Sequence, residues 1–169
     1  MKKFALLALV ALEILVCACG TSTNSSTTTT TTSASGNWQA SLVGGRGQSG
    51  ALDFVTTFNV GAGGGTLSFT AFTFLTTNLC FATGPSGTGN ATLTTDASNN
   101  VTGTMNLTFV SKTPAGNTLT LTGTTVTGTS NKGILTNGKV IGTWMLTGGA
   151  GDASCVAPAG TFTLTQSSS

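Results

Sequence analysis

The stretch VTGTMNLTFV, Val101 to Val110, decides the fold because large apolar side chains recur in it at alternate positions. Val101, Met105, Leu107 and Phe109 share one face, and threonine and asparagine occupy the other. Side chains of a β-strand point alternately to opposite sides, whereas the apolar face of a helix repeats every ~3.6 residues. The stretch therefore predicts a strand with one face toward a core and the other toward water.

The same alternation recurs along the chain from residue 37 onward, and no segment there has sustained helical spacing. Roughly eight to ten short strands predict an all-β fold. We expect an antiparallel up-and-down meander that closes as a small barrel, with a β-sandwich as the alternative. The side chains predicted to face inward, besides those of residues 101–110, are Trp38, Ala40, Leu42, Leu52, Phe54, Phe58, Val60, Leu119, Leu121, Val140, Trp144, Leu146, Phe162 and Leu164.

Residues 65–77, GTLSFTAFTFLTT, interrupt the regular alternation. Leu67, Phe69 and Ala71 share one face, but Phe72 and the phenylalanine that follows two residues later take the other. A β-bulge or bend near Ala71 would return all of them to the core, because one extra residue reverses the side on which later side chains lie. The alternative is a strand that is apolar on both faces.

Segments rich in glycine and asparagine are predicted to connect the strands. The strongest hairpin signal is TNGK, because Asn137 and Gly138 both tolerate the positive φ of a type I′ turn. Turn-forming residues also predict connections at residues 61–65, 84–90, 98–100 and 114–117.

The composition excludes a nucleic-acid partner. Only 6% of the 169 residues are charged, and the formal net charge is +2. Beyond the first segment the cations are Arg46, Lys112, Lys132 and Lys139, which are scattered along the sequence. Binding to nucleic acid requires clustered lysine and arginine that displace counterions.

The first segment, MKKFALLALVALEILVCACG, has the layout of a secretory signal peptide. Lys2 and Lys3 precede an apolar run that ends in small residues. A transmembrane helix needs about 20 apolar residues. The run is shorter and contains Glu13, so we do not expect it to span a membrane.

The end of this segment resembles the lipobox of bacterial lipoproteins, in which a small residue precedes an acylated cysteine. Ala18 is the small residue and Cys19 the lipidation site, because Cys17 follows the bulky Val16. The resemblance implies a lipoprotein held at a membrane by acyl chains such as palmitate. Gly20 stands where aspartate would signal inner-membrane retention, which implies the outer membrane. The alternative is plain secretion after cleavage behind Ala18.

We expect three parts: a signal peptide at residues 1–18, a lipid-anchored Ser/Thr-rich tether at 19–36 and a β domain at 37–169. The tether contains no large apolar side chain whose burial could offset the entropy of ordering it. It is therefore predicted to be flexible, or alternatively an O-glycosylated stalk.

Cysteine usage predicts one disulfide. When Cys17 leaves with the signal peptide and Cys19 is acylated, Cys80 and Cys155 remain as an even pair. In an oxidising compartment such a pair is expected to form a bond. The alternative is two free buried thiols.

No arrangement of residues predicts catalysis or metal binding. Histidine is absent, and the aspartates beyond the first segment, Asp53, Asp96 and Asp152, lie far apart in sequence. General acid–base chemistry, zinc and calcium sites each need clustered groups of these types. We therefore expect a non-enzymatic protein without metal or cofactor.

Ligand binding is the alternative function. The segments GTWMLTGG (residues 142–149) and GTFTLTQ (160–166) resemble the last strands of avidin-type and lipocalin-like barrels, and, with the GNW of residues 36–38, the pattern of small bacterial lipoproteins. The barrel resemblance implies a site for a small apolar molecule beside Phe54, Phe72, Phe74 or Trp144.

Overall fold

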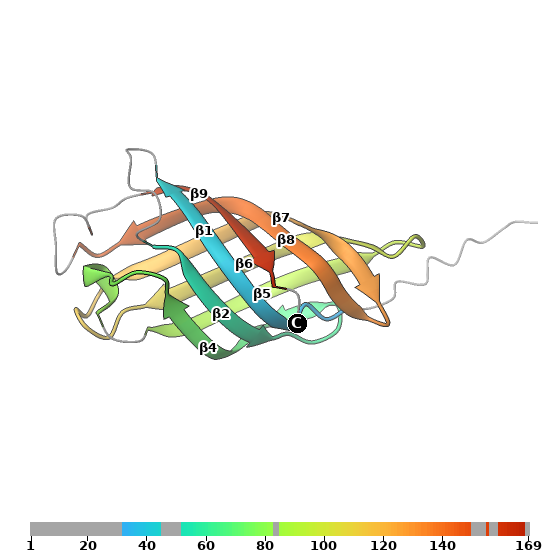
Figure 1. Ribbon diagram of the computed structural model, residues 1–169, viewed down its shortest axis with the longest axis horizontal. Coiled ribbons are helices and arrows are strands. Elements are labelled where there is room, and N and C mark those ends of the chain that lie inside the picture. Colours follow the sequence, from blue (N-terminus) through green and yellow to red (C-terminus); the bar gives the residue numbers. More distant parts are fainter. Residues whose placement is uncertain (1–31, 45–51, 83–84, 150–154, 156–158, 168–169) are drawn as a thin grey trace, which may run out of the picture.

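The computed structural model describes residues 32–44, 52–82, 85–149, 155 and 159–167. These residues form one nine-stranded antiparallel sheet and the short 3-10 helix η1 (Leu79–Phe81) (Figure 1). The prediction of an all-β fold is confirmed. The strands are β1 (Gly36–Gly44), β2 (Phe54–Asn59), β3 (Gly64–Thr66), β4 (Ser68–Phe74), β5 (Ser86–Thr95), β6 (Asn100–Val110), β7 (Thr118–Asn131), β8 (Ile134–Thr147) and β9 (Ala159–Gln166).

The sheet closes into a nearly complete up-and-down barrel, as predicted. Its strand order is β3-β5-β6-β7-β8-β9-β1-β2-β4, so β5 to β9 lie side by side in sequence order, and β9 pairs with β1. Beyond β1 and β2, β2 pairs with β4, and β5 pairs with β3. β3 and β4, at the two ends of this order, are separated in sequence only by Leu67. The Leu67 amide donates to the Gly89 carbonyl on β5 at 2.9 Å. One bent strand therefore joins both edges of the sheet.

The predicted inward-facing side chains form the core. All the side chains that the alternation predicts to face inward are less than a tenth exposed. They include Val101, Met105, Leu107 and Phe109 of β6. Complete burial of a large apolar side chain contributes about 1.5–3 kcal/mol before ordering costs. Threonine alternates with these residues on the outer face of β6 and β7, where it is mostly exposed.

A β-bulge interrupts β4 where the phase of the sequence slips. Thr57 of β2 pairs with Ala71, whereas the next residue, Phe58, pairs with Phe69, so Thr70 is the extra residue. The bulge turns Phe72 toward the core on the same side as Phe69. The predicted bulge is confirmed, but Ala71 itself lies outside, exposed beside Thr70.

The hairpin turn between β7 and β8 lies five positions before Asn137 and Gly138, so that turn prediction is wrong. Lys132 and Gly133, with φ of 51° and 78°, form the turn. Asn137 has φ of 54° but lies inside β8, where the pairing with β7 is irregular. A side chain on Gly138 would begin 2.5 Å from the Trp38 ring. Packing of this tryptophan from β1 explains a glycine within β8.

β5 begins in a segment that the sequence predicts as a connection, residues 84–90, so that assignment is also wrong. Gly87 and Gly89 give no apolar signal, yet they alternate in phase with the buried Ala91 and Leu93. A Cβ on Gly87 would lie 3.0 Å from the Phe109 ring and 3.1 Å from the Phe69 ring. Rings from β4 and β6 therefore fill the space at Gly87, whereas a Cβ on Gly89 would lie 2.6 Å from the Asn106 carbonyl oxygen and 3.1 Å from the Leu107 side chain.

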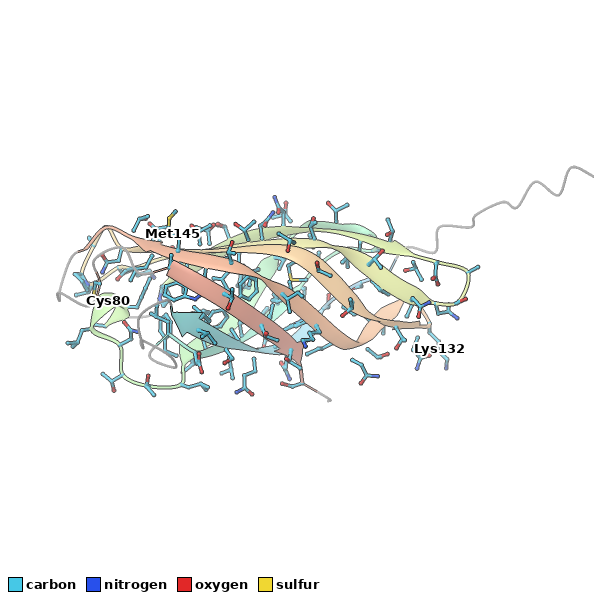
Figure 2. The ribbon with its side chains drawn as sticks, turned by 90° about the horizontal axis from the view of Figure 1, so that it is seen from above. Cys80, Lys132 and Met145 are labelled. Atoms are coloured by element: carbon cyan, nitrogen blue, oxygen red, sulfur yellow. A yellow bond between two sulfur atoms is a disulfide. The ribbon has the colours of Figure 1, made fainter. Side chains whose placement is uncertain are left out.

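The two ends of the barrel differ in their connections. At one end, the turn end, the chain turns at residues 60–63, 96–99 and 132–133. At the other, the loop end, lie the strand ends that lead from β1 to β2, from β4 to β5, from β6 to β7 and from β8 to β9. Figure 2 shows Lys132 at the turn end and Cys80 at the loop end, far apart along the barrel.

Residues 32–35, which the sequence assigns to the tether, belong to the folded turn end. Thr32 is 1% exposed, and its hydroxyl lies 2.7 Å from the Thr95 hydroxyl and donates to Ser130 Oγ at 2.8 Å. The Ser33 amide donates to Gly133, and the Leu135 amide donates back to Ser33. The folded part therefore begins before residue 37, while residues 1–31, including Cys19, lie outside the described residues.

Candidate functional site

The disulfide between Cys80 and Cys155 fastens η1 to the loop end. It joins residues 75 positions apart in sequence, with a Cα–Cα distance of 5.6 Å. The predicted pairing is confirmed. Because Cys155 lies in the segment before β9, the bond ties the connection after β4 to the connection after β8.

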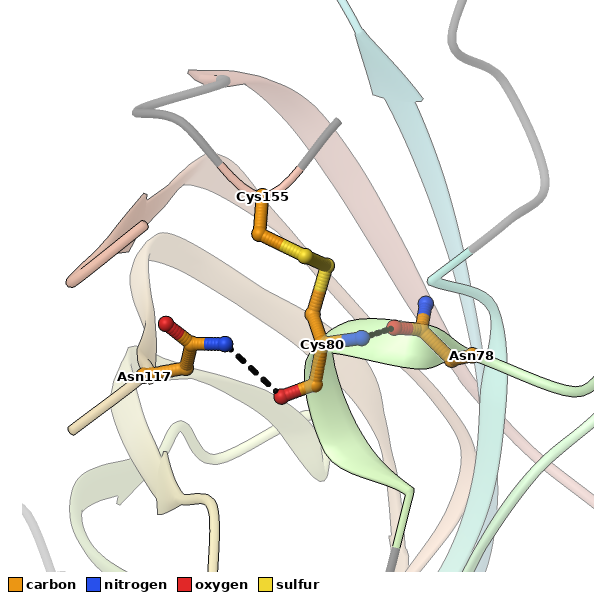
Figure 3. Close-up of a disulfide and its surroundings, with 4 residues drawn as sticks. All are labelled: Asn78, Cys80, Asn117 and Cys155. Atoms are coloured by element: carbon orange, nitrogen blue, oxygen red, sulfur yellow. Dashed lines mark hydrogen bonds between the residues drawn. A yellow bond between two sulfur atoms is a disulfide. The ribbon is translucent and has the colours of Figure 1, made fainter. Parts of the chain in front are cut away.

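Two asparagine side chains hold the backbone of Cys80 (Figure 3). Asn78 Oδ1 accepts a hydrogen bond from the Cys80 amide at 2.8 Å, and Asn117 Nδ2 donates to the Cys80 carbonyl at 3.0 Å. Asn117 is fully buried, and its own carbonyl accepts from the Ser111 amide. The loop end is thus fixed at η1 by one covalent bond and by hydrogen bonds from both sides.

Phenylalanine rings fill the barrel below η1. Phe54 is fully buried, with ring centroids 4.8 Å from Phe72 and 5.1 Å from Phe109. Phe74 lies 5.2 Å from Phe81 of η1, which is 4% exposed. Such tilted and edge-on contacts contribute about 0.5–1.5 kcal/mol per pair beyond burial. Around Phe54 the interior is occupied by protein rings.

A pocket of about 410 Å³, the rim pocket, opens beside this cluster. It lies between the end of β4, η1 and the start of β5. None of the side chains that line it is charged. They are Phe72, Thr73, Phe74, Thr76, Thr77, Asn78, Leu79, Phe81, Ala82 and Pro85.

Exposed apolar side chains gather around the loop end. They come from strand residues near this end and from the connection after β4, and Figure 2 shows Met145 on the outside of the barrel toward the end that holds Cys80. At the turn end, in the part of the chain that the structure describes, Ile134 is the comparable residue. The loop-end residues are Val43, Val55, Leu75, Leu79, Val110 and Met145.

The four residues predicted for a ligand site are placed in three environments. Phe72 and Phe74 line the rim pocket, half-buried, and Phe54 lies beneath them as part of the packed core. Trp144, on β8, does not line the pocket; its indole N–H donates to the Val43 carbonyl at 3.2 Å.

Leu79 and Phe81 are pocket residues that sequence reasoning missed. They lie in a connection without periodicity, so no strand pattern marked them. The usable signal was two large apolar residues flanking a cysteine already expected to form a disulfide. A cysteine anchored in this way fixes the positions of both neighbours, of which Leu79 is exposed and Phe81 is buried.

The remaining titratable groups play local roles. Asp53 accepts the Leu42 amide at 2.7 Å. Asp96 accepts the side-chain and backbone N–H groups of Asn100 and the Ser98 amide, which hold the pKa of the Asp96 carboxyl below its ordinary value. Asp152 lies outside the described residues. Among those described, no three His, Cys, Asp or Glu side chains cluster as a metal site, and no helix has the length and apolarity of a membrane span.

A second pocket, of about 290 Å³, lies at the turn end. Its lining includes Ser35, Asn37, Ile134, Asn137 and Gln166. Its lining contains asparagine, glutamine and serine and, unlike that of the rim pocket, no phenylalanine.

No protein-family model, curated protein or solved structure shows significant similarity to this chain. The candidate site is therefore defined by its geometry alone.

Proposed function

We propose that the protein is a lipid-anchored envelope lipoprotein, without enzymatic activity, that presents the loop end of its barrel away from an outer membrane. The lipobox resemblance at Ala18 and Cys19 supports the anchor. Two or three acyl chains on Cys19 would hold the protein stably at a membrane, at about 0.8 kcal/mol per buried methylene.

The observation that carries the orientation is that both described ends of the chain lie at the turn end. Residues 32–35 pack against Val60, Gly133 and Leu135 there, and the Ser167 amide donates to the Asn37 carbonyl. A tether that leads to residue 32 reaches the barrel at this end. The longer connections, the disulfide and most of the exposed apolar side chains lie at the other.

Replacement of the lipid site tests the anchor. In the full chain, Cys19→Ser is expected to abolish acylation and to move the protein from the membrane to the soluble or unprocessed precursor fraction. Metabolic labelling with radioactive palmitate, followed by cell fractionation and density separation of the two membranes, measures both. Cys17→Ser is the matched control and is expected to leave labelling intact. Unchanged labelling of the Cys19→Ser protein would refute the proposal.

Relaxation measurements test the orientation. In the wild-type full chain on lipid nanodiscs, headgroups that carry gadolinium should broaden the amide signals of Lys132 and Gly133 more than that of Lys112. Equal broadening at the two ends, or the reverse order, would show that the loop end does not face outward.

A second candidate function is the binding of a small apolar molecule. The observation that favours it is the rim pocket, in which Phe72 and Phe74 lie beside Leu79 and Phe81 without a charged neighbour in the lining. A saturable titration of the full chain with a soluble aromatic compound tests this function, wherever on the barrel the compound binds.

A further inference from the structure

We propose that the rim pocket binds an uncharged molecule of two or three fused rings, which enters where β4 and the first part of β5 are not joined. This inference rests on the second candidate function and specifies its site and its ligand class. It differs from a lipocalin-like arrangement because the ligand lies in the barrel wall and not in the interior.

The barrel wall lacks a backbone hydrogen-bond ladder beside the rim pocket, and the Phe69 ring of β4 packs against Gly87 of β5 there. β4 pairs with β2, while β5 pairs with β3 only through Asn90–Thr92. The Leu67 amide bonds to Gly89, and among the described residues no ladder joins β4 to Ser86–Thr88. A gap in the ladder therefore separates β4 from β5 toward the loop end.

Phenylalanine side chains border this gap without being fully buried. Phe69, Phe72 and Phe74 are partly exposed, whereas Phe54 and Phe109, which they contact, are fully buried. Partly exposed rings next to a completed core leave apolar surface that a ligand can cover. Leu79, at 60% exposure, forms the opposite lip of the pocket.

The size and chemistry of the pocket define the ligand class. An apolar cavity of about 150 Å³ accepts one benzene molecule. The rim pocket, at about 410 Å³, therefore has room for two or three fused rings. Phenylalanine faces favour flat apolar rings, and a lining of threonine and asparagine without charged groups favours a neutral molecule.

The wall that carries Leu79 and Phe81 is held in place before any ligand arrives. The Cys80–Cys155 bond and the hydrogen bonds from Asn78 and Asn117 fix the residue between them. A preformed wall reduces the entropy that is lost on binding. This fixation distinguishes the rim pocket from an apolar patch on an unrestrained loop.

Indole is a suitable probe because it is neutral, soluble and has two fused rings. We would titrate the isotope-labelled full chain on lipid nanodiscs with indole and record backbone amide shifts by NMR. Saturable shifts are expected at Thr73, Phe74, Leu79 and Phe81. Unlike a partitioning dye, this measurement separates binding to the protein from uptake by lipid.

Two leucine-sized residues at opposite ends provide matched variants. Leu79→Ala should raise the dissociation constant for indole roughly three- to tenfold, because it removes apolar contact at the lip. Ile134→Ala, which changes a 54% exposed side chain in the turn-end pocket, should leave it unchanged. Both substitutions are at exposed positions and should preserve the fold, which the unperturbed amide spectrum checks.

The outcomes separate this inference from the broader function. Saturable shifts confined to the rim pocket and weakened by Leu79→Ala support it. Saturable shifts elsewhere, in the interior or around Ile134, would overturn the site but keep small-molecule binding. The absence of saturable shifts up to the solubility limit of indole would overturn both, and equal weakening by the two variants would overturn the site.

Discussion

The two ends of the barrel are closed by different physical means. At the turn end, backbone and hydroxyl hydrogen bonds from Thr32 and Ser33 close the sheet around two- to four-residue turns. At the loop end, a disulfide, a buried asparagine and packed rings secure η1. Short turns satisfy their backbone groups locally, whereas longer connections need added restraint. The rim pocket lies at this restrained end. Binding sites are commonly formed by loops that a rigid scaffold holds in place.

The side chains that fill the interior also differ between the two ends of the barrel. Near the loop end, rings from β2, β4 and β6 fill the barrel, and β5 contributes Gly87 and Gly89. Toward the turn end, β5 contributes Leu93 to the core. The inward-facing residues of β5 therefore change from glycine to leucine along the strand. The volume available to their side chains is set by strands that are distant in sequence.

The largest expected effect comes from removing the covalent restraint at the loop end. The double variant Cys80→Ser/Cys155→Ser should lower the free energy of unfolding by about 4 to 5 kcal/mol, because a closed loop of about 75 residues restricts the unfolded chain. Urea denaturation followed by tryptophan fluorescence measures this difference. A loss below about 1 kcal/mol would show that the loop end is held by packing alone.

The part of β5 that contains Gly89 should not accept a larger side chain at this position. A Cβ on Gly89 would lie 2.6 Å from the Asn106 carbonyl oxygen, so Gly89→Ala must displace backbone and should cost about 1–3 kcal/mol. Thr88→Ala, on the exposed face of the same strand, is the control and should change stability by less than about 0.5 kcal/mol. Equal effects of the two variants would contradict the packing account.

The hydroxyl hydrogen bonds at the turn end should contribute a similar amount to stability. Thr32→Val keeps the shape of the side chain but leaves the hydroxyls of Thr95 and Ser130 without this partner. Loss of such a buried bond costs about 1–3 kcal/mol. Thr94→Val, at the exposed Thr94–Thr102 pair, is the control. Chemical denaturation compares them, and a Thr32→Val protein as stable as its control would mean that residues 32–35 do not close the barrel.

The smallest expected effect is a pH dependence at the turn 96–99. Hydrogen bonds to the carboxylate of Asp96 lower its pKa in the folded state, so its contribution is present above the unfolded pKa and is lost as pH falls through the folded one. Asp96→Asn should therefore be slightly less stable than wild type at pH 7, with the difference shrinking in acid. Thermal unfolding at pH 7 and in strong acid tests this, and a difference that grows in acid would have the wrong sign.

The site was only partly accessible to sequence reasoning. Phe72 and Phe74 were predicted through the barrel resemblance, and Cys80 because an even cysteine pair has few alternatives. Leu79 and Phe81 were not predicted. Whether a residue of this connection is exposed or buried depends on where the disulfide holds the connection. Trp144 was grouped with these residues by its chemistry, but its strand lies elsewhere in the barrel wall.

The sequence by itself determined the all-β class, the core strands other than β5, the bulge in β4 and the disulfide, and it left a barrel and a β-sandwich as alternatives. Each of these predictions follows from local alternation of side chains or from the number of cysteines. Neither argument requires knowledge of which residues are in contact in the folded protein. Tertiary structure alone decided that β5 is a strand, that Asn137 and Gly138 lie within β8 and that residues 32–35 close the turn end. The reason is that glycine, asparagine and threonine fit turns, strands and surfaces almost equally well. Their roles are assigned by what packs against them: the Phe109 ring at Gly87, the Trp38 ring at Gly138 and the Thr95 hydroxyl at Thr32.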